Sequence, residues 1–255
     1  MISIITVTYN SGRTLECTMQ SVLAQNFTNY EYIIIDGGST DDTLEIIHSK
    51  ESLFQGKLKW LSEKDNGIYN AMNKGIKMAS GNIIGILNSD DFFTSPFILS
   101  TISDSFEMSD LDAVYGDVHF VHPKNLSKTI RYYSSKFFSR RLMIFGFMPA
   151  HPTFYAKRVV FEKFGLYKED YKIAADFEFL LRTIYKGIIK IKYIPIDMVT
   201  MRIGGASTSG IYSHRIIMKE HLRAFHENGL YTNIVLLTMR YIYKVCELLY
   251  SRLKL

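Results

Sequence analysis

Cysteine, long apolar runs and a leader segment are what this sequence has least of. Its 255 residues include only two cysteines, Cys17 and Cys246, which lie far apart and match no metal-binding or redox spacing. This argues against a disulfide scaffold and fits a reducing compartment. No run of about 18 apolar residues is present, so we expect no membrane span. Met1-Ile2-Ser3 leads straight into a strand pattern without a basic segment or cleavage site, so we expect no signal peptide.

A large excess of one charge is also missing. The 30 basic and 25 acidic residues give a net charge of +5 without a dense basic stripe, which argues against a nucleic-acid partner. This modest excess suits an anionic small substrate or a membrane surface. The chain has neither a G-x-G-x-x-G nor a Walker lysine motif, so Rossmann dehydrogenases and P-loop enzymes are poor alternatives. Hydrophobic residues make up 47% of the chain, enough to bury the core of a large α/β domain.

The most informative stretch runs from Asn82 to Phe93. It begins with an apolar run interrupted only by Gly85, which is typical of a strand covered on both faces. The run ends at Asn88-Ser89-Asp90-Asp91, and open α/β sheets bind their ligands at the carboxyl ends of strands. A carboxylate pair with flanking oxygen donors suits a hard divalent cation, which in turn suits a diphosphate. A turn followed by a helix cap is the alternative reading of the same residues.

The chain before this stretch alternates between strand and helix patterns. Alternating or continuous apolar residues predict three strands, at Ser3–Thr8, Tyr32–Ile35 and Lys57–Leu61. Apolar residues at helical spacing predict a helix after each of them. Such alternation implies a parallel sheet with right-handed crossovers. The polar or glycine-rich segments that end these strands should therefore converge with the Asp pair. In the second of them Asp36 is suited to accept from a base or ribose, although a turn before Gly37-Gly38 explains it equally well.

Four segments together resemble a known family. V-T-Y-N, I-I-D-G-G-S-T-D-D-T, D-N-G-I-Y-N-A-M-N-K-G-I and L-N-S-D-D are similar to the motifs of the family 2 glycosyltransferases of the GT-A fold. The resemblance is close in the first half and looser up to about Ser209. It implies an α/β, Rossmann-related, mixed and mostly parallel sheet flanked by helices. It also implies a nucleotide-sugar donor, most often a UDP-sugar, a Mn²⁺ or Mg²⁺ ion, and inversion at the anomeric carbon.

The resemblance also implies roles for individual residues. Asp36 would contact the base or ribose, Asp90 would lie near the ribose, and Asp91 would bind the cation that bridges the diphosphate. The full set of predicted nucleotide-sugar contacts is Thr8, Tyr9, Asn10, Asp36, Asp65, Asn73 and Asp90. The roles of Asp65 and Asn73 within their motif are the least defined of these.

Asp176 is the candidate catalytic base. Ala174-Ala175-Asp176 precedes apolar residues at helical spacing, so helix capping is the alternative reading. The segment resembles the family's Glu-Asp base motif, with Ala175 in place of the Glu. Inverting transfer needs one carboxylate to take the proton of the acceptor hydroxyl. His151 is a second candidate in this half, to be weighed against a buried, hydrogen-bonded histidine.

The rest of the second half is less regular. Strands are expected at Asp112–Val121 and Lys128–Tyr133, and two more at Ile189–Tyr193 and Ile196–Arg202 with Pro195 between them. The aromatic and basic segment Phe137–Phe147 is a candidate for acceptor contact. The glycine-rich run 204–210 reads as a loop, which the resemblance likens to a lid near the diphosphate. Arg202 and His214 flank it as candidate phosphate or metal contacts, although a solvated helix start also explains them.

These observations predict a catalytic domain at 1–210, with a nucleotide-binding half at 1–93 and an acceptor half at 94–210. Amphipathic helices are expected at 211–255, packed on protein or resting on an anionic bilayer. The predicted protein is a cytoplasmic or peripheral membrane glycosyltransferase that acts on a glycan or lipid-linked saccharide in polysaccharide biosynthesis. The alternatives are a sugar-phosphate nucleotidyltransferase and a nucleotide-sugar-binding interaction module without turnover.

Overall fold

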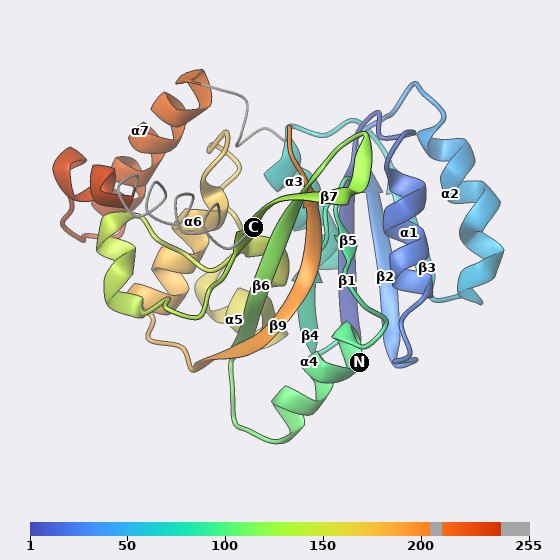
Figure 1. Ribbon diagram of the computed structural model, residues 1–255, viewed down its shortest axis with the longest axis horizontal. Coiled ribbons are helices and arrows are strands. Elements are labelled where there is room, and N and C mark those ends of the chain that lie inside the picture. The colour runs from blue at the N-terminus through green and yellow to red at the C-terminus, as the bar shows by residue number, and fades with distance from the viewer. Residues whose placement is uncertain (205–210, 241–255) are drawn as a thin grey trace.

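A single mixed sheet of nine strands organises the protein, whose computed structural model describes residues 1–204 and 211–240 (Figure 1). The strand order is β3-β2-β1-β4-β8-β6-β9-β5, with β7 paired to β6. The strands are β1 (Ile2–Thr8), β2 (Tyr30–Asp36), β3 (Leu58–Ser62), β4 (Ile83–Ile86), β5 (Phe92–Phe93), β6 (Ala113–His122), β7 (Asn125–Tyr133), β8 (Tyr155–Lys157) and β9 (Ile191–Arg202).

Helices cover both faces of this sheet. The α-helices are α1 (Leu15–Leu23), α2 (Thr43–Glu51), α3 (Ile68–Met78), α4 (Ile98–Glu107), α5 (Arg158–Phe164), α6 (Ala175–Leu180) and α7 (Ile211–Glu227). Short 3-10 turns lie at Ser52–Phe54, Arg140–Phe145 and His151–Thr153, and α6 continues into a π-helical turn at Leu181–Lys186. Residues 234–240 are also helical. Within 1–204 and 211–240, no helix is both long and apolar enough to cross a membrane.

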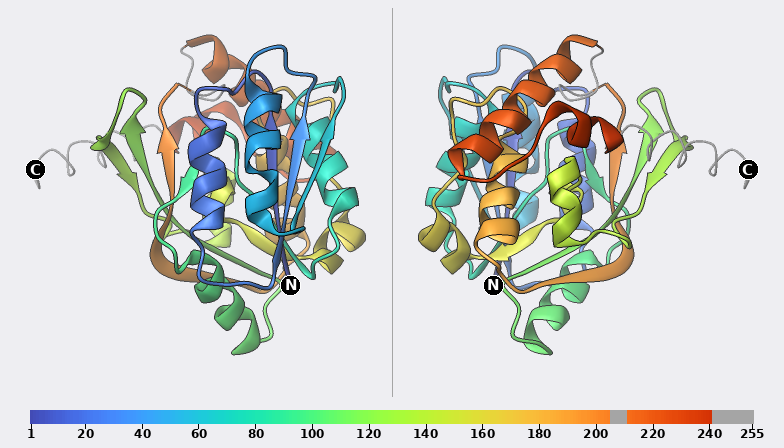
Figure 2. Two further views of the ribbon diagram at one scale, coloured as in Figure 1. Left: turned by 90° about the vertical axis from the view of Figure 1, so that its right-hand side faces the viewer. Right: turned by 90° about the vertical axis from the view of Figure 1, so that its left-hand side faces the viewer.

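The alternation of side chains along each strand creates two separate cores. In β1, Ile4 packs with α1, α2 and α4, whereas Ile5 packs on the other face with α3 and α6. In β2, Ile34 and Ile35 divide in the same way, because successive strand residues point to opposite faces. Figure 2 shows α1 and α2 over one face and α6 and α7 over the other. The predicted doubly covered strands and the predicted fold class are confirmed.

The register of the first strands aligns their carboxyl ends. β1 pairs in parallel with both β2 and β4, and β2 pairs in parallel with β3. Thr8 lies opposite Asp36, and Asp36 lies opposite Ser62. The loops that follow these strands therefore leave the sheet side by side, as the sequence predicted.

Gly85 marks the seam between the parallel strands and the mixed half of the sheet. β4 pairs antiparallel with β8, and this pairing sets Gly85 opposite Tyr155. A β-carbon on Gly85 would lie 2.1 Å from Cε1 of Tyr155, too close for any side chain. The tyrosine ring fills the space that a side chain on β4 would occupy. Glycine is therefore required here by a close approach of a neighbouring side chain.

Pro195 does not divide the last strand, which corrects the sequence-based expectation. β9 runs without a break from Ile191 to Arg202, paired in parallel with β6. The register shifts between Tyr115↔Tyr193 and Asp117↔Asp197, and Pro195 lies inside that irregularity. A proline lacks the N–H needed for a regular ladder but is tolerated at a bulge.

Two further predictions fall partly on residues that the structure does not describe. The glycine-rich loop at 204–210 is described only at residue 204, and the expected C-terminal helix only as far as residue 240. The expected helix from 213 to 227 is found within α7.

Candidate functional site

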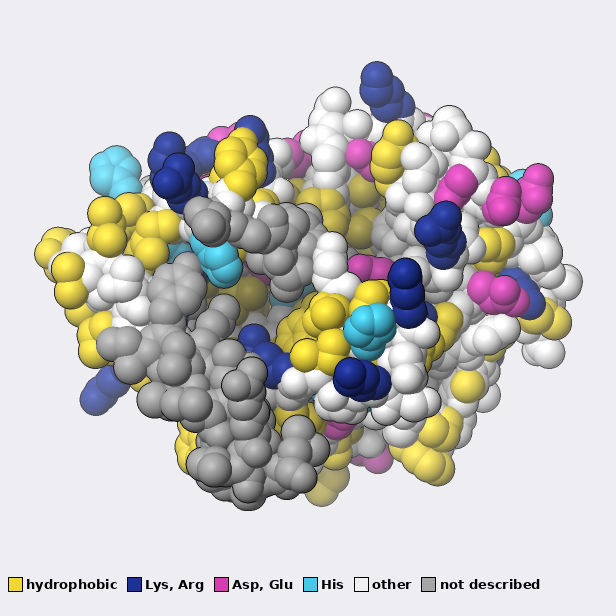
Figure 3. Space-filling model, turned by 45° about the horizontal axis from the view of Figure 1, so that its top comes forward, with side chains coloured by type: hydrophobic (Ala, Val, Ile, Leu, Met, Phe, Trp, Pro, Cys, Tyr) yellow, Lys and Arg dark blue, Asp and Glu magenta, His cyan; other side chains and the backbone are white. Residues whose placement is uncertain are grey.

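A cleft of about 480 Å³ opens at the carboxyl ends of the parallel strands. Figure 3 brings this face forward and shows acidic side chains near its hollowed centre. The loops after β1, β3 and β4 contribute to its walls, together with the end of β9 and the start of α6. The predicted site residues that line it are Thr8, Tyr9, Asp65, Asp90, Asp91, His151, Asp176 and Arg202.

The Asp90-Asp91 turn is anchored from two directions. The Thr18 hydroxyl, on α1, donates to the backbone oxygens of Ser89 at 3.0 Å and Asp91 at 2.7 Å. From the other side the Arg202 guanidinium, at the end of β9, donates to the Asp90 carbonyl oxygen and lies 5.0 Å from the Phe92 ring centroid. The turn is thus fixed by elements from both halves of the chain.

The electrostatics of this turn favour a bound positive charge. Asp91 is only 1% exposed. Burial raises its pKa well above the ordinary value, and the neighbouring charge of Asp90 raises it further. Burial also raises the pKa of Asp90, while the charge of Arg202 opposes the rise in both. A pair of adjacent, poorly hydrated carboxylates repels itself unless a cation lies between or beside them.

The oxygen donors at the turn fit a hard divalent cation. Asn88 donates through Nδ2 to Asp91 Oδ2 at 3.2 Å, while its buried Oδ1 has no hydrogen-bond partner among the described residues. Thr8 Oγ1, in the same cleft, is buried and likewise lacks a partner there. Residues 1–204 and 211–240 contain no cluster of three or more His, Cys, Asp or Glu that could hold a metal alone. One or two carboxylates completed by phosphate oxygens is the arrangement that Mg²⁺ commonly uses.

Asp176 lies across the cleft from this turn, in the first turn of α6. Its Oδ1 accepts a hydrogen bond from the Phe177 backbone N–H at 2.7 Å. Asp176 therefore caps one backbone N–H group at the start of α6. Burial raises its pKa to about 6, and the negative charge of Glu220 adds to the rise. Such a carboxylate is ionised at neutral pH and is still a better proton acceptor than an exposed aspartate.

Family comparison agrees with this geometry. Residues 3–171 match the sequence profile of Glycosyl transferase family 2, a range that covers all four motif segments and the loops after β1, β3 and β4. The chain belongs to glycosyl transferase family 2. The resemblance inferred from the sequence, and the prediction of an enzyme, are therefore confirmed.

Two relatives show how far the sequence similarity of this glycosyltransferase extends. It is 32% identical over 221 residues to an uncharacterized glycosyltransferase of Mycobacterium tuberculosis, covering 84% of this chain and 78% of that one. It is 27% identical over 225 residues to a PGL/p-HBAD biosynthesis glycosyltransferase of Mycobacterium bovis, covering 88% and 83%.

Solved structures share the fold of this glycosyltransferase. TarS 1-349 of S. aureus, solved in complex with UDP-GlcNAc, superposes with a TM-score of 0.68 at 19% identity. The match covers 88% of this chain and 66% of that fragment, so this chain spans slightly less than two thirds of its length. A mannosyltransferase from Pyrobaculum calidifontis, in complex with GDP-Man and Mn²⁺, gives 0.64 at 17% identity, covering 89% and 63%. At such identities the likeness establishes the GT-A fold.

Three predicted donor contacts, Asn10, Asp36 and Asn73, are not among the residues that line the glycosyltransferase cleft. Asp36 is fully buried and accepts from Gly38 N–H, Ser39 N–H and the hydroxyls of Ser39 and Ser62. The Asn10 side chain accepts from Thr40 N–H at 2.9 Å. Both residues therefore shape the loops that flank the cleft.

Asn73 has a structural explanation that competes with its predicted role. It is 2% exposed, donates to the Tyr167 carbonyl and to Glu169, and accepts from Tyr167 N–H at 3.0 Å. It joins α3 to the segment that leads into α6. Its predicted contact with the donor stays a prediction.

His151 lines both the cleft and a second cavity, whereas His214 lines only the second cavity. That cavity, of about 280 Å³, shares Phe120, His151, Ile173, Asp176 and Met201 with the cleft, and His214 lines it from α7. His151 donates to or accepts from the Tyr167 hydroxyl at 2.8 Å, and burial lowers its pKa to about 4. It is therefore neutral at physiological pH and suited to hydrogen bonding rather than to charge compensation.

Glu220 is a residue of the site that the sequence analysis missed. From α7 its carboxylate accepts from three consecutive backbone N–H groups, those of Lys172, Ile173 and Ala174, at 2.6, 3.0 and 2.8 Å. These residues come immediately before the turn that carries Asp176. A single glutamate on a helical stripe gives no local signal of such a role, because its partners lie 46 to 48 residues away in the sequence.

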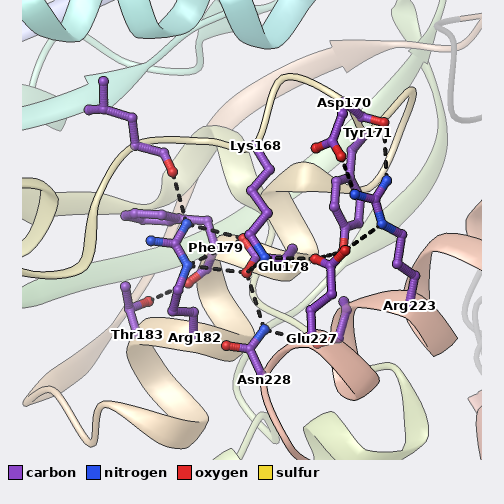
Figure 4. Close-up of polar contacts among 12 residues, drawn as sticks. Lys168, Asp170, Tyr171, Glu178, Phe179, Arg182, Thr183, Arg223, Glu227 and Asn228 are labelled. Atoms are coloured by element: carbon purple, nitrogen blue, oxygen red, sulfur yellow. Dashed lines mark hydrogen bonds and ion pairs between the residues drawn. The ribbon is translucent and has the colours of Figure 1, made fainter.

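A network of ion pairs reinforces the same contact between α6 and α7 (Figure 4). Glu178, fully buried on α6, pairs with Arg182 at 3.1 Å and Lys168 at 3.2 Å, and accepts from Asn228 at 3.1 Å. Lys168 also pairs with Glu227, near the end of α7, at 2.7 Å. The helix that carries Asp176 is thus held to α7 on both sides of that residue.

Proposed function

We propose that this glycosyltransferase moves a sugar from a nucleotide-sugar donor onto a hydroxyl of a glycan or lipid-linked saccharide, with a divalent cation and with inversion. The observation that carries the proposal is the place of Asp176, which lies where the cleft with the Asp90-Asp91 turn meets the second cavity. A donor held at the turn and an acceptor in the second cavity would meet at this carboxylate. We assign donor binding to residues 1–93 and acceptor binding to residues 94–210, with α7 contributing to the second cavity through His214.

Asp176 is proposed as the general base. It would take the proton of the acceptor hydroxyl as the oxygen attacks the anomeric carbon from the face opposite the leaving diphosphate. The carbon–oxygen bond to the diphosphate breaks as the new glycosidic bond forms, so the configuration is inverted. Glu220 holds the three preceding backbone N–H groups and thereby positions Asp176.

Asp91, with Asp90 and Asn88 beside it, is proposed to hold the cation. When bound, Mn²⁺ or Mg²⁺ would neutralise charge on the departing nucleoside diphosphate. Arg202 adds a fixed positive charge at the same end of the cleft. The UDP-GlcNAc complex of TarS and the GDP-Man and Mn²⁺ complex of the mannosyltransferase support a nucleotide sugar and a divalent cation for this fold. Thr8, Tyr9 and Asp65 would contact the nucleotide.

We place the enzyme on the cytoplasmic face of a membrane. Ile234, Val235 and Met239 are 58%, 72% and 46% exposed and fall on one side of helical residues 234–240, which supports contact with an apolar surface. Flotation with vesicles containing anionic lipid tests this part of the proposal. A protein that stays with the soluble fraction at low salt would contradict it.

Calorimetric titration of UDP, GDP and dTDP, with and without Mn²⁺, is the test of the donor site. We expect one nucleotide to bind tightly only with the metal. If none binds, the proposal is wrong and a nucleotide-independent interaction module becomes the better explanation. If one binds, but incubation with its sugar conjugates gives neither transfer nor slow hydrolysis, a binding module without turnover is indicated. Release of pyrophosphate from a nucleoside triphosphate and a sugar phosphate would indicate a nucleotidyltransferase.

A further inference from the structure

A third cavity, of about 420 Å³, lies beside the acceptor side of the molecule and is almost entirely apolar. It is enclosed by the end of β7, by the segment that follows it, and by helical residues 234–240. None of the described residues that line it is charged; they are Tyr133, Ser134, Ser135, Phe137, Phe138, Leu142, Phe145, Phe147 and Met239. Cavities of this size and character bind drug-sized apolar groups.

This apolar cavity adjoins the proposed acceptor cavity. Tyr133 and Phe147 line both. The Tyr133 hydroxyl donates to the Met148 carbonyl at 2.7 Å, which fixes the ring at the boundary between them. Because the acceptor cavity meets the donor cleft at Asp176 and His151, the donor cleft, the acceptor cavity and the apolar cavity follow one another in that order.

The acceptor cavity itself offers few of the carboxylate and amide groups that commonly bind a free sugar. A sugar presents hydroxyl groups on most sides and is bound through several carboxylates or amides, because each buried hydroxyl needs a partner. Among the described residues that line this cavity, Asp176 is the only carboxylate and no Asn or Gln is present; the other charged or imidazole side chains are Arg131, His151, His214, His221 and Arg240. Phe120, Phe147 and Met148 supply much of the wall instead.

We propose that the third cavity binds a hydrocarbon aglycone of the acceptor, whose hydroxyl-bearing part lies in the second cavity against Asp176. This inference rests on the proposed function and specifies its acceptor class as an amphipathic molecule. Each methylene group that enters the cavity would raise acceptor affinity by about fourfold, since its burial contributes about 0.8 kcal/mol.

The neutral fluorophore N-phenyl-1-naphthylamine serves as a probe of the cavity, in competition with methyl, butyl and octyl glucosides below their micelle concentrations. We expect saturable binding to the full chain and displacement that strengthens with alkyl length. Phe137 lines the cavity and is 71% exposed, so Phe137→Ser removes an apolar wall without opening the core. It should weaken probe binding at least fivefold. Met108→Ser, at an 81% exposed methionine at the end of α4 that does not line the cavity, is the matched control and should not change it.

Measuring the release of nucleoside diphosphate from the preferred donor tests whether this cavity takes part in the reaction. Whether a glucoside accelerates or inhibits release, its half-effect concentration should fall at least tenfold from methyl to octyl, and Phe137→Ser should flatten this dependence. Unsaturable probe binding, or equal effects of Phe137→Ser and Met108→Ser, would overturn the cavity assignment. Metal-dependent nucleotide binding is measured on the same samples. Its absence would overturn the proposed function, and the acceptor role with it, even where the probe binds as expected.

Discussion

Asp91 and Asp176 are both carboxylates withdrawn from water at the same cleft, but their neighbours differ. Asp91 stands beside a second carboxylate, and its hydrogen-bond donor is the weakly placed amide of Asn88 at 3.2 Å. Asp176 accepts from a backbone N–H at 2.7 Å and is followed by a helix that an ion-pair network holds in place. The raised pKa has burial as its main cause in each.

These different neighbours mean that the Asp90-Asp91 turn needs a bound cation to ionise fully, whereas Asp176 does not. Among the described residues, Arg202 is the charge that offsets the Asp90-Asp91 pair, and the ionised form of the pair becomes favourable when a cation binds. Asp176, with a pKa of about 6, is ionised at neutral pH without any ligand. The first arrangement suits binding of a metal–diphosphate, and the second suits proton transfer.

Asp91→Asn should give the largest effect. Loss of the cation site should remove Mn²⁺-dependent nucleotide binding and lower transfer by about 10⁴-fold, since a metal contributes several kcal/mol to the leaving-group charge. The metal-free variant should melt at a higher temperature than the parent, because a buried, self-repelling charge has been removed. Asp104→Asn, at an exposed position on α4, is the control. Retained metal-dependent binding in Asp91→Asn would contradict the assignment.

Asp176→Asn should affect only the chemical step. General-base catalysis contributes about 10²–10⁴-fold, so we expect kcat to fall by about 10³-fold while calorimetric binding of nucleotide and Mn²⁺ is unchanged. The two variants together separate binding from proton transfer. Full turnover by Asp176→Asn would show that another group is the base.

Lowering the pH should reduce activity without removing the contribution of Asp176 to the stability of the fold. Activity requires ionised Asp176, so kcat should fall about tenfold per pH unit below pH 6. The effect on stability has the opposite sign. With a pKa raised from 3.8 to about 6, the folded state binds more protons than the unfolded one in this range, so this group's contribution to stability grows as the pH falls through 6. Melting curves and rates measured from pH 4.5 to 8 would test both; a flat kcat would exclude Asp176 as the base.

Glu220→Gln should have the smallest effect and the most specific one. A glutamine cannot accept from three N–H groups as a carboxylate does, so we expect kcat to fall about threefold to tenfold as Asp176 loses its fixed position. Loss of the Glu220 charge should also move the acid limb of the pH profile to lower pH, because that charge raises the pKa of Asp176. Glu227→Gln removes an acidic residue of the same helix that pairs with Lys168. It should lower stability without moving the limb; equal profiles for the two variants would contradict the positioning role.

The first half of the fold could be predicted closely because its signals are local. The apolar runs of β1, β2 and β4 and the helical stripe of α3 each lie within a dozen residues, and parallel pairing follows from their alternation. Convergence at the cleft then follows for Thr8, Asp65 and Asp91. Asp36 and Asn73 matched motifs equally well, but whether a side chain points into a cleft or behind it depends on packing that no motif contains.

The second half depends on long-range pairing and was harder to predict. Pro195 appeared to end a strand because its tolerance depends on a bulge against β6, almost 80 residues earlier. Glu220 was missed because its partners lie in another segment. The apolar cavity beside Tyr133 likewise depends on how helical residues 234–240 approach β7, which the sequence alone does not determine.

The contact between Gly85 and Tyr155 also limits which substitutions this sequence can accept during evolution. Because the Tyr155 ring occupies the space beside the α-carbon of Gly85, the side chains at positions 85 and 155 compete for the same volume. A substitution at either position alone leaves a clash or a void, so the viable routes pass through paired exchanges of size. In natural variants of this chain, a residue larger than glycine at position 85 should be accompanied by a small one at position 155. The Asp90-Asp91 turn follows five residues after Gly85, so its position depends on how these two residues pack.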